Sequence, residues 1–260
     1  MQIVVYSESR LVKRNRGTVP ILLTCPHDGS EAPAKVRERT ASDTPARCQF
    51  KTGRDSGAAA ITEGIAQKIL EITGLSPYVV IAKFHRKFID ANRNQDCAFI
   101  DPDALKFYDE YHKWINFYIR NLTEQNNGLG FLFDVHGVGE IDGDPADVYF
   151  GTANGDTFLP SFDRDAFFMN HGLHGYLKWT NQTIGGDNEI FSWRVSPADS
   201  STPETSEVNG GFTVRHYSSK INCVQIELNS EMRLNTEKRR IAIEDLAFGM
   251  INFVRRHAPF

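Results

Sequence analysis

The sequence predicts an α/β fold with a mixed, mostly parallel sheet. Short, wholly apolar runs, typical of strands buried on both faces, alternate with longer segments whose apolar residues recur at helical spacing. Several of these runs end in turn residues or polar side chains, as expected for the strands of a layered α/β protein. In such sheets a ligand site forms beyond the carboxyl ends of the strands, so that edge is where functional residues are expected.

The first half of the chain contains two predicted strands and two predicted helices. The run VPILLTC at residues 19–25 predicts a buried strand that stops at Pro-His-Asp-Gly. Residues 28–54 are polar and interrupted by two prolines, which indicates a long loop of the functional or mobile kind. Residues 55–73 keep isoleucines on one face and predict a helix that ends at Gly74. The other expected elements are a strand at residues 78–82 and a helix at residues 102–125.

The second half continues the alternation. The run GFLFDV at residues 130–135 predicts a third buried strand, and CVQIEL at residues 223–228 predicts another. Residues 235–257 predict a terminal helix whose basic last turn suits the helix dipole. Residues 196–211, rich in Ser, Thr and Pro, predict a loop. A short strand at residues 147–150 and a helix at residues 163–179 complete the expected elements.

Composition and charge exclude several classes of protein. The chain has 260 residues, of which 40% are hydrophobic and 24% are charged, as in a globular rather than a disordered protein. Lys and Arg number 29 and Asp and Glu number 33, and this net charge of −4 argues against a general binder of nucleic acid or anionic membranes. No apolar run reaches the ~20 residues that span a bilayer, and the N-terminal residues do not resemble a signal peptide.

The cysteines favour a reduced protein. The chain contains four, too few for a disulfide framework at this length, and no two of them have the CxxC spacing. Together with the lack of a recognisable signal peptide, this predicts a cytoplasmic location. The four cysteines are Cys25, Cys48, Cys97 and Cys223.

Polar side chains stand where three of the apolar runs stop or weaken. His27 follows the first run, His136 follows GFLFDV, and Glu227 lies late in CVQIEL. Two neutral imidazoles with a carboxylate suit a zinc ion that leaves its fourth position to water, and a further carboxylate can take the proton of that water. A histidine after a strand is more often a turn residue or a hydrogen-bonding core residue, so the spacing leaves both interpretations open.

The tract at residues 84–95 follows a predicted buried strand and is rich in Arg and Asn. Arg86 and Arg93 flank Asp90 and Asn92. Arginine binds carboxylates through paired hydrogen bonds, and a nearby Asn adds a neutral donor, so the tract is a candidate carboxylate-binding segment. A surface loop with an internal Asp–Arg pair is the alternative.

Six motifs together resemble a known family. They are Pro-His-Asp-Gly at residues 26–29, Arg-Asp-Ser-Gly-Ala at 54–58, Arg-x-x-x-Asp-x-Asn-Arg at 86–93, Asp-Val-His-Gly at 134–137, Gly-Gly-Phe-Thr-x-Arg at 210–215 and Gln-Ile-Glu-Leu at 225–228. In this order they resemble the N-formylglutamate amidohydrolase family, whose fold is similar to that of the zinc carboxypeptidases. The resemblance runs from about residue 20 to 235. It implies a single three-layer domain over residues 1–260, because His27 and Glu227 have to meet in one site.

The resemblance also implies a role for each motif residue. His27 and His136 would bind one zinc ion per chain, with Asp55 as the carboxylate ligand at the start of the helix after the His27 loop. Glu31 is a rival third ligand, and a plain helix N-cap is the alternative role of Asp55. Glu227 would be the general base that activates water and then protonates the leaving amine; its alternative is an ion pair with a neighbouring arginine.

The remaining implied residues bind substrate. Arg86, Asn92 and Arg93 would hold the carboxylate of a small anionic N-acyl, and in particular N-formyl, acidic amino acid. Arg215, after Gly210 and Gly211, would hold a second carboxylate or the oxyanion. No nucleic-acid or membrane partner is implied, and a homo-oligomer stays open. Two other functions also stay open: a zinc peptidase acting on a glutamyl or peptide substrate, and a non-catalytic carboxylate-binding protein.

Three positions depart from the family pattern. Asp28 stands where Ser or Thr is usual, His85 replaces a Ser before Arg86, and Gly137 replaces the Ser after the second histidine. An acid next to His27 would alter metal affinity or the preferred substrate charge. The departures leave the implied metal ligands intact and put the identity of the substrate in doubt.

Overall fold

Four parallel strands form the centre of the main sheet. In the computed structural model, which describes residues 5–184 and 189–260, they lie in the spatial order β4, β3, β5 and β10. Nearly every residue in these strands is buried, which explains why their sequences are apolar runs. The bounds are β3 Ile21–Cys25, β4 Tyr78–Ala82, β5 Phe131–Gly137 and β10 Asn222–Leu228.

Shorter strands extend the sheet at both edges. β2 (Val12–Asn15) pairs antiparallel with β4, and β1 (Val5–Tyr6) pairs with β2. At the other edge β6 (Val148–Gly151) runs antiparallel to β10, and β9 (Val195–Ser196) lies parallel to β6. The sheet is therefore mixed with a parallel centre, as predicted. A separate antiparallel hairpin is formed by β7 (Asn181–Ile184) and β8 (Glu189–Ser192).

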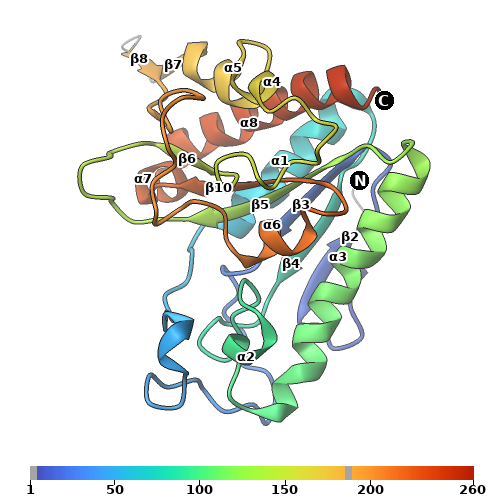
Figure 1. The fold of residues 1–260 in the computed structure, drawn as a ribbon, viewed down its shortest axis with the longest axis vertical. Coiled ribbons are helices and arrows are strands. Elements are labelled where there is room, and N and C mark those ends of the chain that lie inside the picture. Colours follow the sequence, from blue (N-terminus) through green and yellow to red (C-terminus); the bar gives the residue numbers. More distant parts are fainter. Residues whose placement is uncertain (1–4, 185–188) are drawn as a thin grey trace.

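Helices cover both faces of the sheet (Figure 1). On one face α1 (Ala58–Thr73), α5 (Leu173–Trp179) and α8 (Thr236–His257) cover the odd-numbered residues of β3 and β5. On the other face α3 (Leu105–Gln125) and α6 (Phe212–Tyr217) cover the even-numbered ones. Because side chains alternate along a strand, each face has its own apolar core, and the molecule has the three layers predicted for it.

Two predicted helices differ from the structure. The helix expected over residues 55–73 begins at Ala58, because residues 55–57 make a turn that ends at Gly57 with a φ of 92°. The helix expected over residues 163–179 is two helices, α4 (Asp165–Phe168) and α5. The Asn-His-Gly sequence at residues 170–172 separates them and is a turn signal that the periodicity obscures. The other short elements are η1 Ala46–Cys48, α2 Gln95–Ala98, η2 Pro102–Ala104 and α7 Ser230–Leu234.

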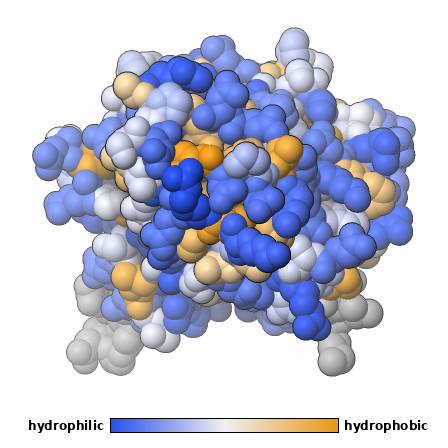
Figure 2. All heavy atoms as spheres, turned by 90° about the horizontal axis from the view of Figure 1, so that it is seen from below, coloured by the Kyte–Doolittle hydropathy of each residue, from blue (hydrophilic) through white to orange (hydrophobic). Residues whose placement is uncertain are grey.

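The surface at the end of the molecule near α2 is mostly hydrophilic, with hydrophobic groups in small patches (Figure 2). Small exposed apolar patches of this kind need no partner to explain them. Among the described residues, no helix is both long enough and apolar enough to cross a membrane.

Candidate metal centre and its cavity

The carboxyl ends of β3, β5 and β10 bring polar side chains to one face of the sheet. Glu227 on β10 lies opposite His136 on β5 in the parallel register, so both side chains leave the sheet on the side of α3 and α6. Asp134 precedes His136 by two residues and therefore shares this face. His27 follows β3, the neighbour of β5. Together these strand ends form the site floor, defined as His27, Asp90, Asp134, His136 and Glu227.

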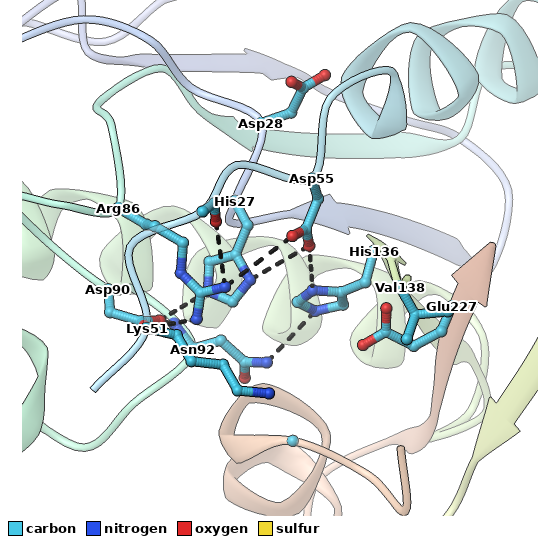
Figure 3. Close-up of polar contacts among 12 residues, drawn as sticks. His27, Asp28, Lys51, Asp55, Arg86, Asp90, Asn92, His136, Val138 and Glu227 are labelled. Atoms are coloured by element: carbon cyan, nitrogen blue, oxygen red, sulfur yellow. Dashed lines mark hydrogen bonds and ion pairs between the residues drawn. The ribbon is translucent and has the colours of Figure 1, made fainter. Parts of the chain in front are cut away.

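The two histidines and Asp55 form a compact cluster. Asp55 Oδ2 lies 3.0 Å from His136 Nδ1 and 3.4 Å from His27 Nδ1. One ligand atom from each of the three residues lies within 4.8 Å of the others, and all three residues are buried. Figure 3 shows the Asp55 carboxylate turned toward both imidazole rings. The helix-cap alternative for Asp55 is wrong, because this carboxylate points at the histidines rather than at the amides of α1.

A buried carboxylate holds the far nitrogen of each histidine. His27 Nε2 donates to Asp90 Oδ1 at 2.6 Å, and His136 Nε2 donates to Asp134 Oδ2 at 2.8 Å. Thr24 donates to the other oxygen of Asp134 at 2.5 Å. With Nε2 occupied as a donor, each ring turns Nδ1 toward Asp55. Metal-binding histidines are oriented by carboxylates in this way, which fixes the tautomer and raises the basicity of the ligand nitrogen.

Charges within the cluster shift its titrations strongly. Burial raises the pKa of Asp55, but hydrogen bonds from His136 and His27 outweigh it and hold that pKa well below its usual range. Burial likewise raises the pKa of Asp90, and the charges of His27 and Arg86 more than compensate, so that carboxyl stays ionised. Burial lowers the pKa of His136, yet Asp134 and Glu227 raise it well above its ordinary value. Asp55 and Asp90 therefore both stay ionised beside the histidines.

Glu227 differs from the other floor carboxylates. Its Oε1 accepts a hydrogen bond from Gln225 Nε2 at 2.6 Å, whereas its Oε2 is buried and has no hydrogen-bond partner among the described residues. Burial raises the pKa of Glu227; His136 opposes this rise and Asp55 adds to it. No arginine pairs with Glu227 in the described part of the chain, so the ion-pair alternative is wrong.

Two acids near His27 lie outside the cluster. Glu31 is exposed and pairs with Lys83, so it is not the third residue of the cluster. Asp28 points away from the histidines (Figure 3). Its Oδ2 accepts from the amides of Gly57 and Ala59 at the start of α1, and its Oδ1 accepts from Arg54 at 2.9 Å. Asp28 therefore caps α1 and braces the Asp55 loop, and the expectation that it alters the charge of the site is not supported.

The residues expected to bind substrate differ in how many hydrogen bonds they already make within the protein. Arg86 donates to Asp90 at 2.6 Å, and Asn92 accepts from the amide of Thr213 at 2.7 Å and lies 3.3 Å from His136. Exposed Arg215 donates to the carbonyls of its own glycine loop, at Asn209 and Gly210. Arg93 makes only a 3.4 Å contact with a carbonyl and, among the described residues, has no carboxylate within 4.0 Å. Of the four, Arg93 is the cation most available to a ligand.

The cluster opens into a cavity of about 590 Å³. Two loops form its walls, residues 49–54 from the long loop after β3 and residues 206–211 from the loop after β9, and these are called the rim below. The rim adds a cation that sequence reasoning missed: Lys51 lines the cavity and extends beside Asn92 (Figure 3). No motif marks Lys51, so only its position reveals it. The volume is that of a small-molecule site.

A disulfide joins η1, which directly precedes the first rim loop, to α2. Cys48 and Cys97 are bonded, with their Cα atoms 5.3 Å apart across 49 residues of chain. The expectation of four reduced cysteines is therefore wrong for this pair, because the fold brings η1 and α2 together at a spacing that no sequence motif marks. Cys25 and Cys223 are free and buried. Disulfides persist mainly in oxidising compartments, so the cysteines no longer argue for a cytoplasmic location.

Comparisons with known proteins support the family resemblance and the fold. Residues 19–101, which include His27, Asp55 and Arg93, match the model of the N-formylglutamate amidohydrolase family. A crystal structure of N-formylglutamate amidohydrolase from Ralstonia eutropha JMP134 is 14% identical, covers 92% of this chain and 95% of its own, and has a TM-score of 0.58.

A gene product of Agrobacterium tumefaciens, also 14% identical, covers 95% of this chain and 94% of its own with a TM-score of 0.61. A comparison with curated proteins found no match. The resemblance predicted from the motifs is confirmed, and the two structures share the fold. His136 and Glu227 lie beyond the segment that the family model matches.

Proposed function

We propose that this chain is a zinc-dependent amidohydrolase that cleaves the amide of a small N-acyl acidic amino acid, with an N-formyl group as the first candidate. One observation carries the proposal: Nδ1 of His27 and of His136 both face one oxygen of Asp55, while a buried carboxylate holds each Nε2. The family match over residues 19–101 supports the class of reaction. We also propose one domain over residues 1–260, because the site draws residues from both ends of the chain.

The donor set fits zinc. Two imidazole nitrogens and one carboxylate oxygen are the protein ligands of many catalytic zinc sites, which keep a further position for water or substrate. His27, Asp55 and His136 would hold the ion, and Asp90 and Asp134 would orient the two histidines. When bound, zinc would polarise the amide carbonyl of the substrate and lower the pKa of a water molecule to roughly 7.

Glu227 is the residue we assign to proton transfer. Within the described ranges its Oε2 is buried without a hydrogen-bond partner, a state that costs about 1–3 kcal/mol and is relieved when the atom accepts a proton from water. The hydrogen bond from Gln225 fixes the orientation of the carboxylate. The raised pKa suits a group that takes a proton from the attacking water and then gives it to the leaving nitrogen.

The cations of the cavity support an anionic substrate. Arg93 and Lys51 line it, and neither has a carboxylate within 4.0 Å among the residues of the described ranges. A substrate carboxylate held there would be oriented with its acyl group toward the cluster, and such positioning lowers the barrier by making the reaction effectively unimolecular. Both loops wall the cavity, which supports a small substrate over a polymeric one.

The test is a metal analysis coupled to hydrolysis of N-formyl, N-acetyl and N-succinyl derivatives of glutamate, aspartate and leucine. We expect about one zinc per chain, hydrolysis of acidic substrates, loss of activity on chelation and recovery with zinc. Full hydrolysis by the metal-stripped protein would contradict the proposal. A higher kcat/KM on glutamyl oligopeptides would favour the peptidase, and stabilisation by glutamate without zinc uptake would favour a binding protein.

A further inference from the structure

Arg233 is a buried arginine that no motif singled out. It lies in α7, just after β10, and is 6% exposed. Among the described residues no carboxylate lies within 4.0 Å of its guanidinium, although it lines the cavity. Burying an unpaired cation is costly unless its N–H groups find acceptors. The groups that accept hydrogen bonds from Arg233 therefore indicate its role.

All three guanidinium nitrogens donate to backbone carbonyls. Nε donates to Leu228 at 2.9 Å, Nη2 donates to Val138 at 3.2 Å, and Nη1 donates to Ser56. Leu228 follows Glu227 and Ser56 follows Asp55, whereas Val138 lies two residues after His136. The single planar group therefore connects the three chain segments that present the proposed base and two of the proposed metal ligands.

Two glycines make room for this arrangement. A Cβ on Gly137 would lie 2.3 Å from Arg233 Nε and 2.4 Å from Cζ, so a serine at this position would collide with the guanidinium. A Cβ on Gly57 would lie 2.8 Å from the carbonyl oxygen of Arg233, and the φ of 92° at Gly57 disfavours other residues as well. The departure from the family pattern at Gly137 is thus matched to the guanidinium packed against it.

We propose that Arg233 is a positioning residue that sets the relative placement of Asp55, His136 and Glu227. This inference rests on the proposed function for its consequence in catalysis, but the connection itself concerns only the chain. Arginine suits the task because its rigid fork presents donors in several fixed directions in one plane, which the ammonium of lysine does not. Loss of the connection should loosen the cluster while the proposed metal ligands and the proposed base all stay in the chain.

Arg233→Lys and Gly137→Ala test the inference from its two sides. Each should lower kcat by about tenfold or more, weaken zinc binding by about tenfold and leave KM within about twofold, because small misplacements cost rate rather than ground-state binding. The double variant should be less impaired than the product of the two single effects, since both act on one contact. Arg256→Met, at an exposed arginine of α8, is the matched control and should change none of these values.

Hydrogen exchange of the unliganded protein gives a readout that needs no metal or substrate. In Arg233→Lys, peptides containing Ser56, Val138 and Leu228 should gain exchange together, and in Arg256→Met they should not. Unchanged exchange there, or a lower Tm with unchanged kcat and zinc affinity, overturns the inference. A wild-type protein that neither binds zinc nor hydrolyses the panel sinks the proposed function alone, because the exchange result still decides the role of Arg233.

Discussion

The site floor and the rim are built in opposite ways. Floor residues such as His136 and Asp134 stand at the ends of central strands, are almost fully buried and hold one another by short hydrogen bonds. Rim residues such as Lys51 and Arg54 stand on loops, are exposed and line the cavity. The difference teaches that rigid strands fix the groups that need exact distances, whereas loops supply the charges that select a ligand. Four predictions test this division.

The largest effect is expected from His136→Ala. Removing one of three proposed ligands should abolish stoichiometric zinc and lower kcat/KM by more than about a thousandfold, because the proposed ion would supply both carbonyl polarisation and the nucleophile. Zinc content and kcat/KM of the purified variant measure this. Lys51→Met, on the rim, should keep about one zinc per chain. Equal loss of zinc in both variants would contradict the division between floor and rim.

Asp134→Asn should have the next largest effect. The substitution keeps the size of the side chain but removes the charge that orients His136 through Nε2. Zinc affinity is expected to fall by about 10- to 100-fold, as for other carboxylates that orient a ligand histidine, and competition with a chelator measures it. Asp28→Asn is the control, because that acid faces α1 rather than the histidines. An unchanged affinity in Asp134→Asn would show that the histidine needs no such support.

The pH dependence of stability tests the packing of α3 against the segment that carries Asp90 and Arg93. His112 in α3 donates from Nε2 to the carbonyl of Ala91 at 3.1 Å and accepts at Nδ1 from Tyr217 at 2.9 Å. Burial, with the nearby His216, lowers the pKa of His112 to about 4 from its ordinary 6.5. Between these values the unfolded chain binds the proton and the folded chain does not, so stability falls as the pH drops from about 6.5 toward 4.

The wild type should therefore lose about 2 kcal/mol more unfolding free energy than His112→Gln when the pH is lowered from 7 to 5. Urea unfolding of both proteins at the two pH values measures the difference. Parallel losses in the two proteins would show that His112 titrates normally in the folded chain.

The smallest effect is expected at the edge of the cavity. Arg93→Met removes the most available cation while leaving the cluster intact, so KM for an acidic substrate should rise by about tenfold with kcat within about threefold. A neutral substrate such as an N-acyl leucine should show no comparable rise. A fall in kcat with unchanged KM would show that Arg93 acts in the reaction itself rather than in binding the substrate carboxylate.

Most of the central fold was predictable from the chain. Runs such as residues 19–25 and 130–135 are apolar because their strands are buried on both faces, and this signal is local. The edge strand β2 was not predictable, because its half-buried sequence has no such run. The break before α5 was missed because an apolar periodicity continues across a turn.

The candidate cluster was predictable only through ordered motifs. His27, Asp55 and His136 are 28 and 81 residues apart along the chain, separations that carry no helical or strand spacing. Asp90 and Asp134, which hold the two histidines, also lie within the six motifs. Nothing in the local sequence, however, marks Asp134 as the partner of His136 rather than as an acid of the core. Three other features depend on the paths of loops, which no sequence pattern encodes. They are the position of Lys51 in the cavity, the Cys48–Cys97 bond and the carbonyls that accept from Arg233.

The sequence by itself determined the parallel α/β core and the residue types gathered at its strand ends. The pattern of buried residues along a strand or helix involves residues close together in the chain, so it can be read from the sequence. The tertiary structure alone decided which nitrogen of each histidine faces Asp55, which arginine has no carboxylate partner among the described residues, and how Arg233 spans three segments. These depend on distances of about 3 Å between residues far apart in the chain, and only the packing of the layers sets such distances.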